Sequence, residues 1–168
     1  MLFNYKLINN DQDTVVKHYR KIFEMANIED VNYIDTLNGR VAECGLRYNE
    51  IKRLLKNHIK NDFPKKQLNV YEPNSKFSST WAKEQIWLDR PVVMTYYLCV
   101  NGKTIGHCIT IVGWFKVQKV NKNKEPYGKS YEYFAVNTGW ENTARFLNYT
   151  DVDFMETPKA FSVKISNK

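Results

Sequence analysis

The sequence lacks long apolar runs. No stretch approaches the roughly twenty consecutive apolar residues that a membrane-spanning helix needs, so no membrane span is expected. The first residues, MLFNYKLINNDQD, contain neither a hydrophobic segment nor a small-residue cleavage site, and they do not predict a secretory signal. The compartment stays open, because a secreted chain after processing would look the same as a cytoplasmic one.

Residues that bind metals or form disulfides are scarce. The chain has three cysteines and three histidines, which are Cys44, Cys99, Cys108, His18, His58 and His107. The cysteines are too few and too scattered for a disulfide scaffold. No CxxC or HxxxH pair occurs, and such pairs are the usual signature of a structural zinc site. The sequence therefore predicts no metal and no cofactor, and His18 and His58, which fall among lysines on predicted helices, are expected to be solvated.

The sequence does have a basic excess and many aromatic rings. Its 168 residues carry a formal charge of +7, and 43% are hydrophobic and 14% aromatic, which is enough for one dense core. Lysines gather in 56–66 and 116–129, which are expected to be a helix end and a loop tip. Because no nucleic-acid motif or basic–aromatic alternation accompanies them, these lysines are expected to serve solubility, and nucleic acid is not predicted as a partner.

Helical patterns come first along the chain. Apolar residues recurring at steps of three and four predict one helix from Asp13 to Ala26 and a second over 46–59. The segment 34–45 is rich in turn residues and is expected to be irregular. A third, short helix is expected to begin near Ser79.

Strand patterns follow the helices. Runs of β-branched and aromatic residues predict strands over 90–100, 107–117, 131–137 and 160–165, and Asn-Gly at 101–102 predicts a hairpin turn. This order, helices first and then an antiparallel sheet, is typical of an α+β domain with its helices packed on the sheet. Since no linker or repeat divides the chain, the sequence predicts a single domain over 1–168, helical to about residue 89 and sheet-forming from about residue 90.

Two polar residues stand at the ends of predicted strands. His107 opens GHCITIVGW after Gly106, and Asn137 ends YEYFAVN. If these strands are antiparallel neighbours, the two side chains meet at one edge of the sheet. An amide oxygen that accepts from one imidazole nitrogen leaves the other facing a reacting group, as a general base requires. The alternatives are a packed histidine with a satisfied hydrogen bond and an asparagine that merely ends a strand.

The stretch W…DRPVVMTYYLCVNGKTIGHCITIVGW…YEYFAVNTGW resembles the second half of papain-like cysteine peptidases, especially the bacterial branch with streptopain and the bacteriocin-leader peptidases. The resemblance covers about residues 78–150. It implies a papain-like fold with His107 as catalytic base and Asn137 as its orienting partner. It also implies that Trp140 shields their hydrogen bond, and Trp114 would be a further indole of the core or substrate cleft.

The nucleophile is where the sequence departs from that family. The family's cysteine begins a long helix, where the helix N-terminus and the histidinium stabilise its thiolate. Asp13 and Thr14 occupy the corresponding place here. Cys44, just ahead of the second predicted helix, is the remaining candidate, with a structural cysteine as the alternative. Cys99 and Cys108 fall within strands and are expected to be packing residues.

Three functions are therefore open. The first is a papain-like cysteine peptidase acting on peptide or amide substrates, with the thiol supplied by Cys44 or from outside this chain. The second is a non-catalytic relative that binds a partner protein on the same fold. The third is a basic module for nucleic acid or an anionic surface, served by the lysines of 116–129. The oligomeric state is not predicted.

Overall fold

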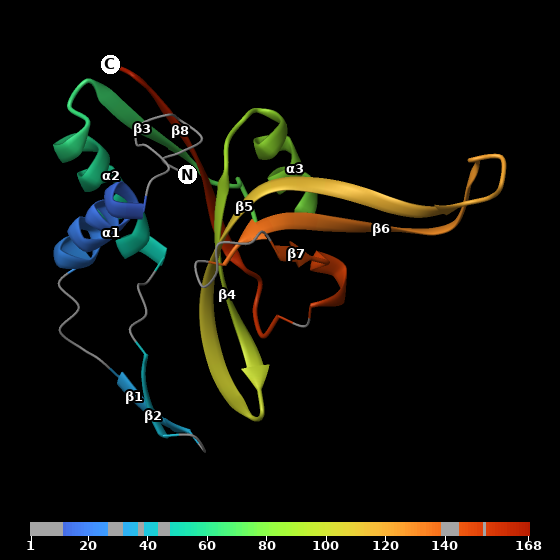
Figure 1. Ribbon diagram of the computed structural model, residues 1–168, viewed down its shortest axis with the longest axis horizontal. Helices are drawn as coiled ribbons and strands as arrows, with labels where there is room; N and C mark the ends of the chain where they lie inside the picture. Colours follow the sequence, from blue (N-terminus) through green and yellow to red (C-terminus); the bar gives the residue numbers. More distant parts are fainter. Residues whose placement is uncertain (1–11, 27–31, 37–38, 44–47, 139–144, 153) are drawn as a thin grey trace. The chain divides into compact units, whose positions relative to one another are not determined.

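The computed structural model describes residues 12–26, 32–36, 39–43, 48–138, 145–152 and 154–168. Its elements are α1 (Gln12–Ala26), β1 (Asn32–Thr36), β2 (Gly39–Glu43), α2 (Tyr48–Asp62), β3 (Lys66–Tyr71), α3 (Ser79–Trp87), β4 (Val92–Val100), β5 (Lys103–Val120), β6 (Pro126–Asn137), β7 (Arg145–Leu147), the 3-10 helix η1 (Tyr149–Asp151) and β8 (Lys159–Asn167). Figure 1 shows this order along the chain, which confirms the α+β class. Within the described residues, no helix is long and apolar enough to cross a membrane.

The main sheet has six strands in the order β3-β8-β4-β5-β6-β7, while β1 and β2 form a separate pair. β4 pairs antiparallel with both β5 and β8, and β6 pairs antiparallel with β5 and β7. The sequence predicts one domain, and the contacts divide the chain into two compact units. Unit 1 comprises Met1–Asn69 with Ile165–Lys168, and unit 2 comprises Val70–Lys164.

The segment expected to be irregular contains a hairpin instead. β1 and β2 pair antiparallel from Asn32↔Glu43 to Thr36↔Gly39. The prediction was wrong because it weighed the turn residues of LNG over the β-branched and aromatic residues on either side, which favour strands. A hairpin needs only two residues between its strands, so turn residues in its middle are compatible with regular pairing.

The Asn-Gly dipeptide forms the predicted hairpin turn between β4 and β5. Asn101 has φ 52° and Gly102 has φ 74°, so both central residues lie in the left-handed region that a type I′ turn requires. Val100 and Lys103 pair directly across this turn. The turn thereby fixes the register of β5 against β4.

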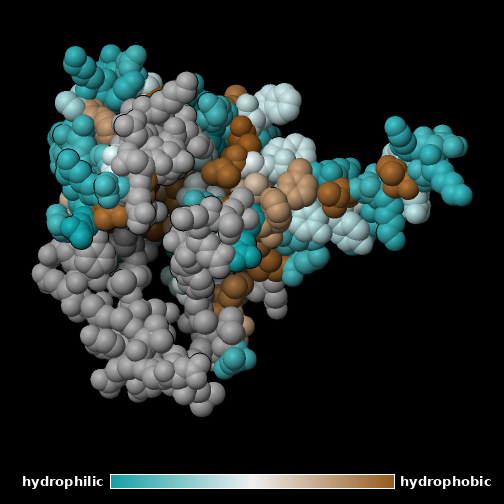
Figure 2. All heavy atoms as spheres, in the orientation of Figure 1, coloured by the Kyte–Doolittle hydropathy of each residue, from teal (hydrophilic) through white to brown (hydrophobic). Residues whose placement is uncertain are grey.

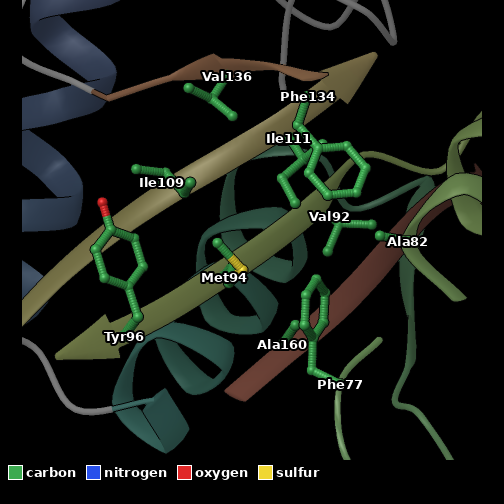
Figure 3. Close-up of a cluster of buried hydrophobic side chains, with 10 residues drawn as sticks. All are labelled: Phe77, Ala82, Val92, Met94, Tyr96, Ile109, Ile111, Phe134, Val136 and Ala160. Carbon is green, nitrogen blue, oxygen red and sulfur yellow. The ribbon is translucent and has the colours of Figure 1, made fainter. Parts of the chain in front are cut away.

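The core of unit 2 lies on one face of β4, β5 and β6, which we call the core face (Figure 3). Its buried residues are Phe77, Ala82, Val92, Met94, Tyr96, Ile109, Ile111, Phe134, Val136 and Ala160. Helix α3 covers this face and is capped by Ser78, whose Oγ accepts a hydrogen bond from the Trp81 amide at 3.2 Å. The buried Ser162 hydroxyl donates to Gln85 Oε1 at 2.7 Å, which satisfies a polar group between helix and sheet.

Candidate functional site

His107 lies on the core face of β5. It pairs with Tyr96 of β4, and the two rings meet edge to face with centroids 5.9 Å apart. Burial lowers the pKa of His107, because a charged imidazole loses hydration there. The side chain is therefore neutral at neutral pH, which suits a packed histidine and a general base equally.

Asn137 does not lie beside His107. It pairs with Thr110, three residues further along β5, and its neighbour Val136 is buried on the core face. Since successive side chains alternate, Asn137 projects from the opposite face. The predicted contact with His107 is wrong because β5 is longer than β6. Its first half pairs with β4 alone, so the start of β5 extends past the end of β6.

The thiols that the structure describes are also separated from the imidazole of His107. Cys108 follows it directly and so projects from the opposite face, where burial raises the pKa of the thiol to about 11. Cys99 pairs with Thr104 near the hairpin turn and is exposed. Cys44, the candidate nucleophile, lies outside the described residues. No described cysteine therefore shares the face of His107.

Of the two predicted indoles, Trp140 lies outside the described residues, and Trp114 lies where β5 leaves the core. Trp114 pairs with Phe134 and remains 38% exposed. Lys83 of α3 reaches over its ring, with Nζ 5.2 Å from the centroid, and also binds Glu132 Oε2 at 2.7 Å. Trp114 is thus part of an anchor between α3 and the strands β5 and β6.

Beyond that anchor, β5 and β6 continue as a two-stranded ribbon (Figure 1). We define the ribbon as residues 114–120, 126–133 and their connection 121–125. β4 pairs with β5 only as far as Ile111, and β7 pairs with β6 only from Phe134 onward. In the described part of the chain, both outer edges of the ribbon therefore have no strand partner.

The connection at the ribbon's end is an ordered turn. The Asn121 amide donates to the Glu125 carbonyl at 2.9 Å, and the Lys124 amide donates to the Asn121 carbonyl at 3.0 Å. Asn121 Oδ1 accepts from the amides of Asn123 and Glu125, each at 2.9 Å. These bonds hold the lysines of the turn on a preorganised backbone. The turn was predicted, but the rest of the stretch 116–129, which was expected to be a loop tip, lies in β5 and β6.

An aromatic row follows the ribbon on the face opposite the core. We use this name for Phe146, Phe115, Tyr133, Val117 and Tyr131. Phe115 and Tyr133 stack with centroids 5.5 Å apart, and the edge of Phe146 meets Phe115 at 5.0 Å. Phe146 is 63% exposed and Tyr131 41% exposed, so the row presents rings to solvent.

Lysines continue the aromatic row toward the end of the ribbon. Lys129 Nζ lies 5.2 Å from the centroid of Tyr131, and Lys119 pairs across the strands with Tyr127. Figure 2 shows hydrophobic and intermediate residues along the ribbon and hydrophilic residues at its end. Tyr127, Lys129, Tyr131 and Tyr133 alternate along β6 in the sequence itself, a signal that sequence reasoning overlooked, whereas the pairing of Lys119 with Tyr127 comes from the fold.

The ribbon's acidic side chains are already engaged. Glu132 binds Lys83, and Glu125 Oε2 accepts from Asn121 Nδ2 at 2.7 Å. The exposed lysines of the ribbon are Lys116, Lys119, Lys122, Lys124 and Lys129. They leave the ribbon with a positive field.

Unit 1 contains a second cluster that the sequence did not predict. His58 was expected to be solvated, but it is only 1% exposed, and the side chain of His18 is 15% exposed. His18 Nδ1 lies 3.1 Å from His58 Nε2, and His58 Nδ1 lies 3.0 Å from Asp62 Oδ2. The available signal was the four-residue spacing of His58 and Asp62, which places them on one face of a helix.

Comparisons of this chain with family models, with curated proteins and with solved structures found no match.

Proposed function

We propose that this chain binds single-stranded nucleic acid along the aromatic row and the lysines of the ribbon. The observation that carries the proposal is the placement of Lys129 over Tyr131 at 5.2 Å, within a row in which the rings of Tyr131 and Phe146 are exposed. Proteins that bind single strands combine a positively charged track for phosphates with aromatic side chains on which bases stack. The ribbon offers both on one surface.

The charge of the ribbon favours a polyanion. The ribbon carries five lysines against two glutamates, and Glu132 is already paired with Lys83 of α3, so the net charge of the ribbon is positive. Each phosphate that a lysine neutralises releases condensed counterions, which makes binding favourable and dependent on salt. The formal charge of +7 over the whole chain supports the same class of partner.

The rings favour a partner with unpaired bases. Alternate positions on a strand lie about 6.6 Å apart, so Tyr133 and Tyr131 present rings at a spacing comparable with that of successive nucleotides in an extended strand. Base–aromatic stacking contributes about 1–3 kcal/mol per base. A duplex hides its base faces, and for that reason we expect single strands to bind more tightly than duplexes of equal length.

Solubility alone does not account for this surface. Unpaired strand edges are commonly protected by lysine, and that role explains the charges of the ribbon. It does not explain why Phe146 is 63% exposed beside Phe115, since exposed rings increase the tendency to aggregate. A binding surface accounts for the rings and the lysines together.

Peptide hydrolysis has less support in the geometry. Its base and orienting residue, His107 and Asn137, project from opposite faces of the sheet. Binding of an acidic protein partner would use the same lysines without needing stacked bases. The two binding classes differ in their dependence on Tyr131, because only a base stacks on its ring.

The test is fluorescence anisotropy of the full chain with a labelled oligothymidylate. Unlabelled duplex and poly-glutamate serve as competitors. We expect the single strand to bind best, with a slope of log K against log salt of roughly −2 to −4, as three to five neutralised phosphates would give. Equal competition by poly-glutamate would assign the surface to acidic proteins. Absence of salt-dependent binding would overturn the proposal.

A further inference from the structure

The cluster in unit 1 joins two imidazoles and a carboxylate. His18 comes from α1, and His58 and Asp62 lie one turn apart on α2. One potential ligand atom from each residue lies within 4.8 Å of the other two. His18 Nδ1 is also 3.8 Å from Asp62 Oδ2, so the carboxylate oxygen faces both rings. All three residues belong to unit 1, whereas the ribbon belongs to unit 2.

Two of the atoms that face one another make no hydrogen bond. His58 Nδ1 and Asp62 Oδ2 are buried and lack a hydrogen-bond partner, although they are only 3.0 Å apart. Their separation is suitable for a hydrogen bond, but the plane of the His58 ring does not point Nδ1 at the carboxylate oxygen, so no hydrogen bond forms. A buried polar atom without a partner is costly, and a cation bound between these two atoms would satisfy both of them.

The surroundings hold the carboxylate and the rings in place. Lys21 Nζ donates to Asp62 Oδ1 at 2.8 Å, which leaves Oδ2 directed at the imidazoles. Phe63 stacks on His18 with centroids 5.7 Å apart and meets His58 edge-on at 5.9 Å. A hydrogen bond to a ligating carboxylate and an apolar wall form the outer shell that orients the ligands of a metal site.

The protonation states also suit a cation. Burial lowers the pKa of His58, an effect that the Asp62 carboxylate only partly opposes, so its imidazole is neutral at neutral pH. For Asp62, burial alone would raise the pKa, but the hydrogen bond from Lys21 and the nearby imidazoles outweigh it and lower the pKa. A neutral imidazole and an ionised carboxylate are the forms that bind metal.

We infer that His18, His58 and Asp62 form a binding site for a first-row divalent cation, with Zn²⁺ the best match. Two imidazoles and one carboxylate are a donor set that zinc accepts, with a fourth position left for water or another ligand. A tetrahedral zinc ion spaces its nitrogen and oxygen ligands about 3.3 Å apart. An ion takes one nitrogen of His58. If that atom is Nδ1, its distance of 3.0 Å to Asp62 Oδ2 and the 3.8 Å from that oxygen to His18 Nδ1 lie on either side of this value. His18 Nδ1 now faces the other nitrogen, Nε2, at 3.1 Å, so the His18 ring must turn toward Nδ1 when the ion binds.

A hollow gives access to the cluster. A cavity of about 350 Å³ is lined by Lys21, Glu24, Met25, His58, Asn61 and Asp62. It can hold the water that a three-ligand site requires. The ammonium of Lys21 opposes an incoming cation, so we expect a weaker site than a closed structural zinc centre.

The test titrates the full chain with Zn²⁺ against a chromophoric chelator, and separately with Co²⁺. We expect one ion per chain, and a visible Co²⁺ spectrum of tetrahedral intensity without a thiolate charge-transfer band. Binding should weaken as the pH falls, because protons compete with the metal for the imidazole nitrogens. His18→Gln and Asp62→Asn should each weaken Zn²⁺ binding at least about tenfold.

Two controls exclude other ligands. His107→Gln removes the chain's remaining histidine, and alkylation with iodoacetamide blocks its cysteines. Neither should change the affinity for Zn²⁺. Circular dichroism of each variant verifies the fold, and His18→Gln decides the matter if Asp62→Asn unfolds, since His18 is partly exposed. The inference is overturned if the unmodified chain binds no ion, if His18→Gln binds as tightly as the parent, or if alkylation abolishes binding.

Discussion

Phe115 of β5 and Tyr133 of β6 stack across the ribbon, with ring centroids 5.5 Å apart and planes 16° apart. This is the first cross-strand pair of the aromatic row on β5 and β6, and Val117 and Tyr131 form the next pair toward the turn. Cross-strand aromatic pairs stabilise a hairpin, which matters where no further strand supports either edge. The same rings that hold the ribbon together thus form the surface proposed to stack on bases.

Replacing Tyr131 by alanine should weaken binding of the single strand. The loss of one stacked base is worth about 1–3 kcal/mol, or roughly a fivefold to hundredfold rise in the dissociation constant. Trp87→Ala is the matched control, because Trp87 is an aromatic residue of α3 that is 84% exposed and outside the ribbon. Anisotropy titrations of both variants give the comparison. Equal affinities for Tyr131→Ala and Trp87→Ala would remove Tyr131 from the proposed surface.

Core packing under α3 predicts a large stability loss for Met94→Ala. Met94 is fully buried in the core of unit 2 (Figure 3), so its truncation leaves a cavity and should lower the free energy of unfolding by about 2–5 kcal/mol. Met155→Ala is the control, since Met155 is 52% exposed and should cost less than about 0.5 kcal/mol. Urea denaturation measures both. A loss below about 1 kcal/mol for Met94→Ala would contradict this core.

The β4–β5 turn predicts a backbone effect at Gly102. Its φ is 74°, and a Cβ built there meets nothing within 4 Å, so Gly102→Ala strains the backbone without causing a clash. We expect a loss of about 1–2 kcal/mol in the free energy of unfolding. Gly113→Ala is the matched control, because its Cβ makes only an ordinary contact of 3.6 Å with Ala135. If both variants unfold at the same urea concentration, the left-handed turn is wrong.

Buried histidines predict how stability depends on pH. Burial lowers the pKa of His58 and of His107 in the folded state, while both sit near 6.5 in the unfolded chain. The unfolded state therefore binds more protons as the pH falls below 6.5, so stability is greatest above that value and declines below it. Around His58 the charged groups are Asp62, His18 and Lys21.

Urea midpoints at about pH 7.5 and about pH 5.5 measure this decline in the absence of metal. His107→Gln removes one of the two titrating groups and should make the decline smaller. A parent chain that is equally stable at both pH values would show that neither imidazole is held neutral by the fold.

Local signals in the sequence predicted local structure well. Asn101 and Gly102 identified their turn because positive φ angles are a property of those residues themselves. The serine-rich start of α3 was recognised for a similar reason, since Ser78 caps the helix through its own side chain. These features need no knowledge of the rest of the chain.

Some contacts of the candidate sites are not contained in any local pattern. Whether Asn137 reaches His107 is set by the register of β5 and β6, which skips one residue between Ile111 and Gly113. The pairing of Lys119 with Tyr127 follows a second shift in this register, between Gln118 and Lys119. Motif searches look for spacings along the chain, whereas these neighbours are joined by tertiary structure.

The most direct measurement compares two sets of neutralised lysines in binding a labelled single strand. In the ribbon set, glutamine replaces four lysines, which are Lys119, Lys122, Lys124 and Lys129. In the control set, glutamine replaces four exposed lysines of unit 1, which are Lys17, Lys56, Lys60 and Lys65. Both sets change the net charge equally, so only position distinguishes them. We predict that the affinity of the ribbon set falls at least about tenfold and that its slope of log K against log salt becomes shallower by roughly 3. The affinity of the control set should fall less than about threefold. Equal losses in the two sets would contradict a binding surface on the ribbon.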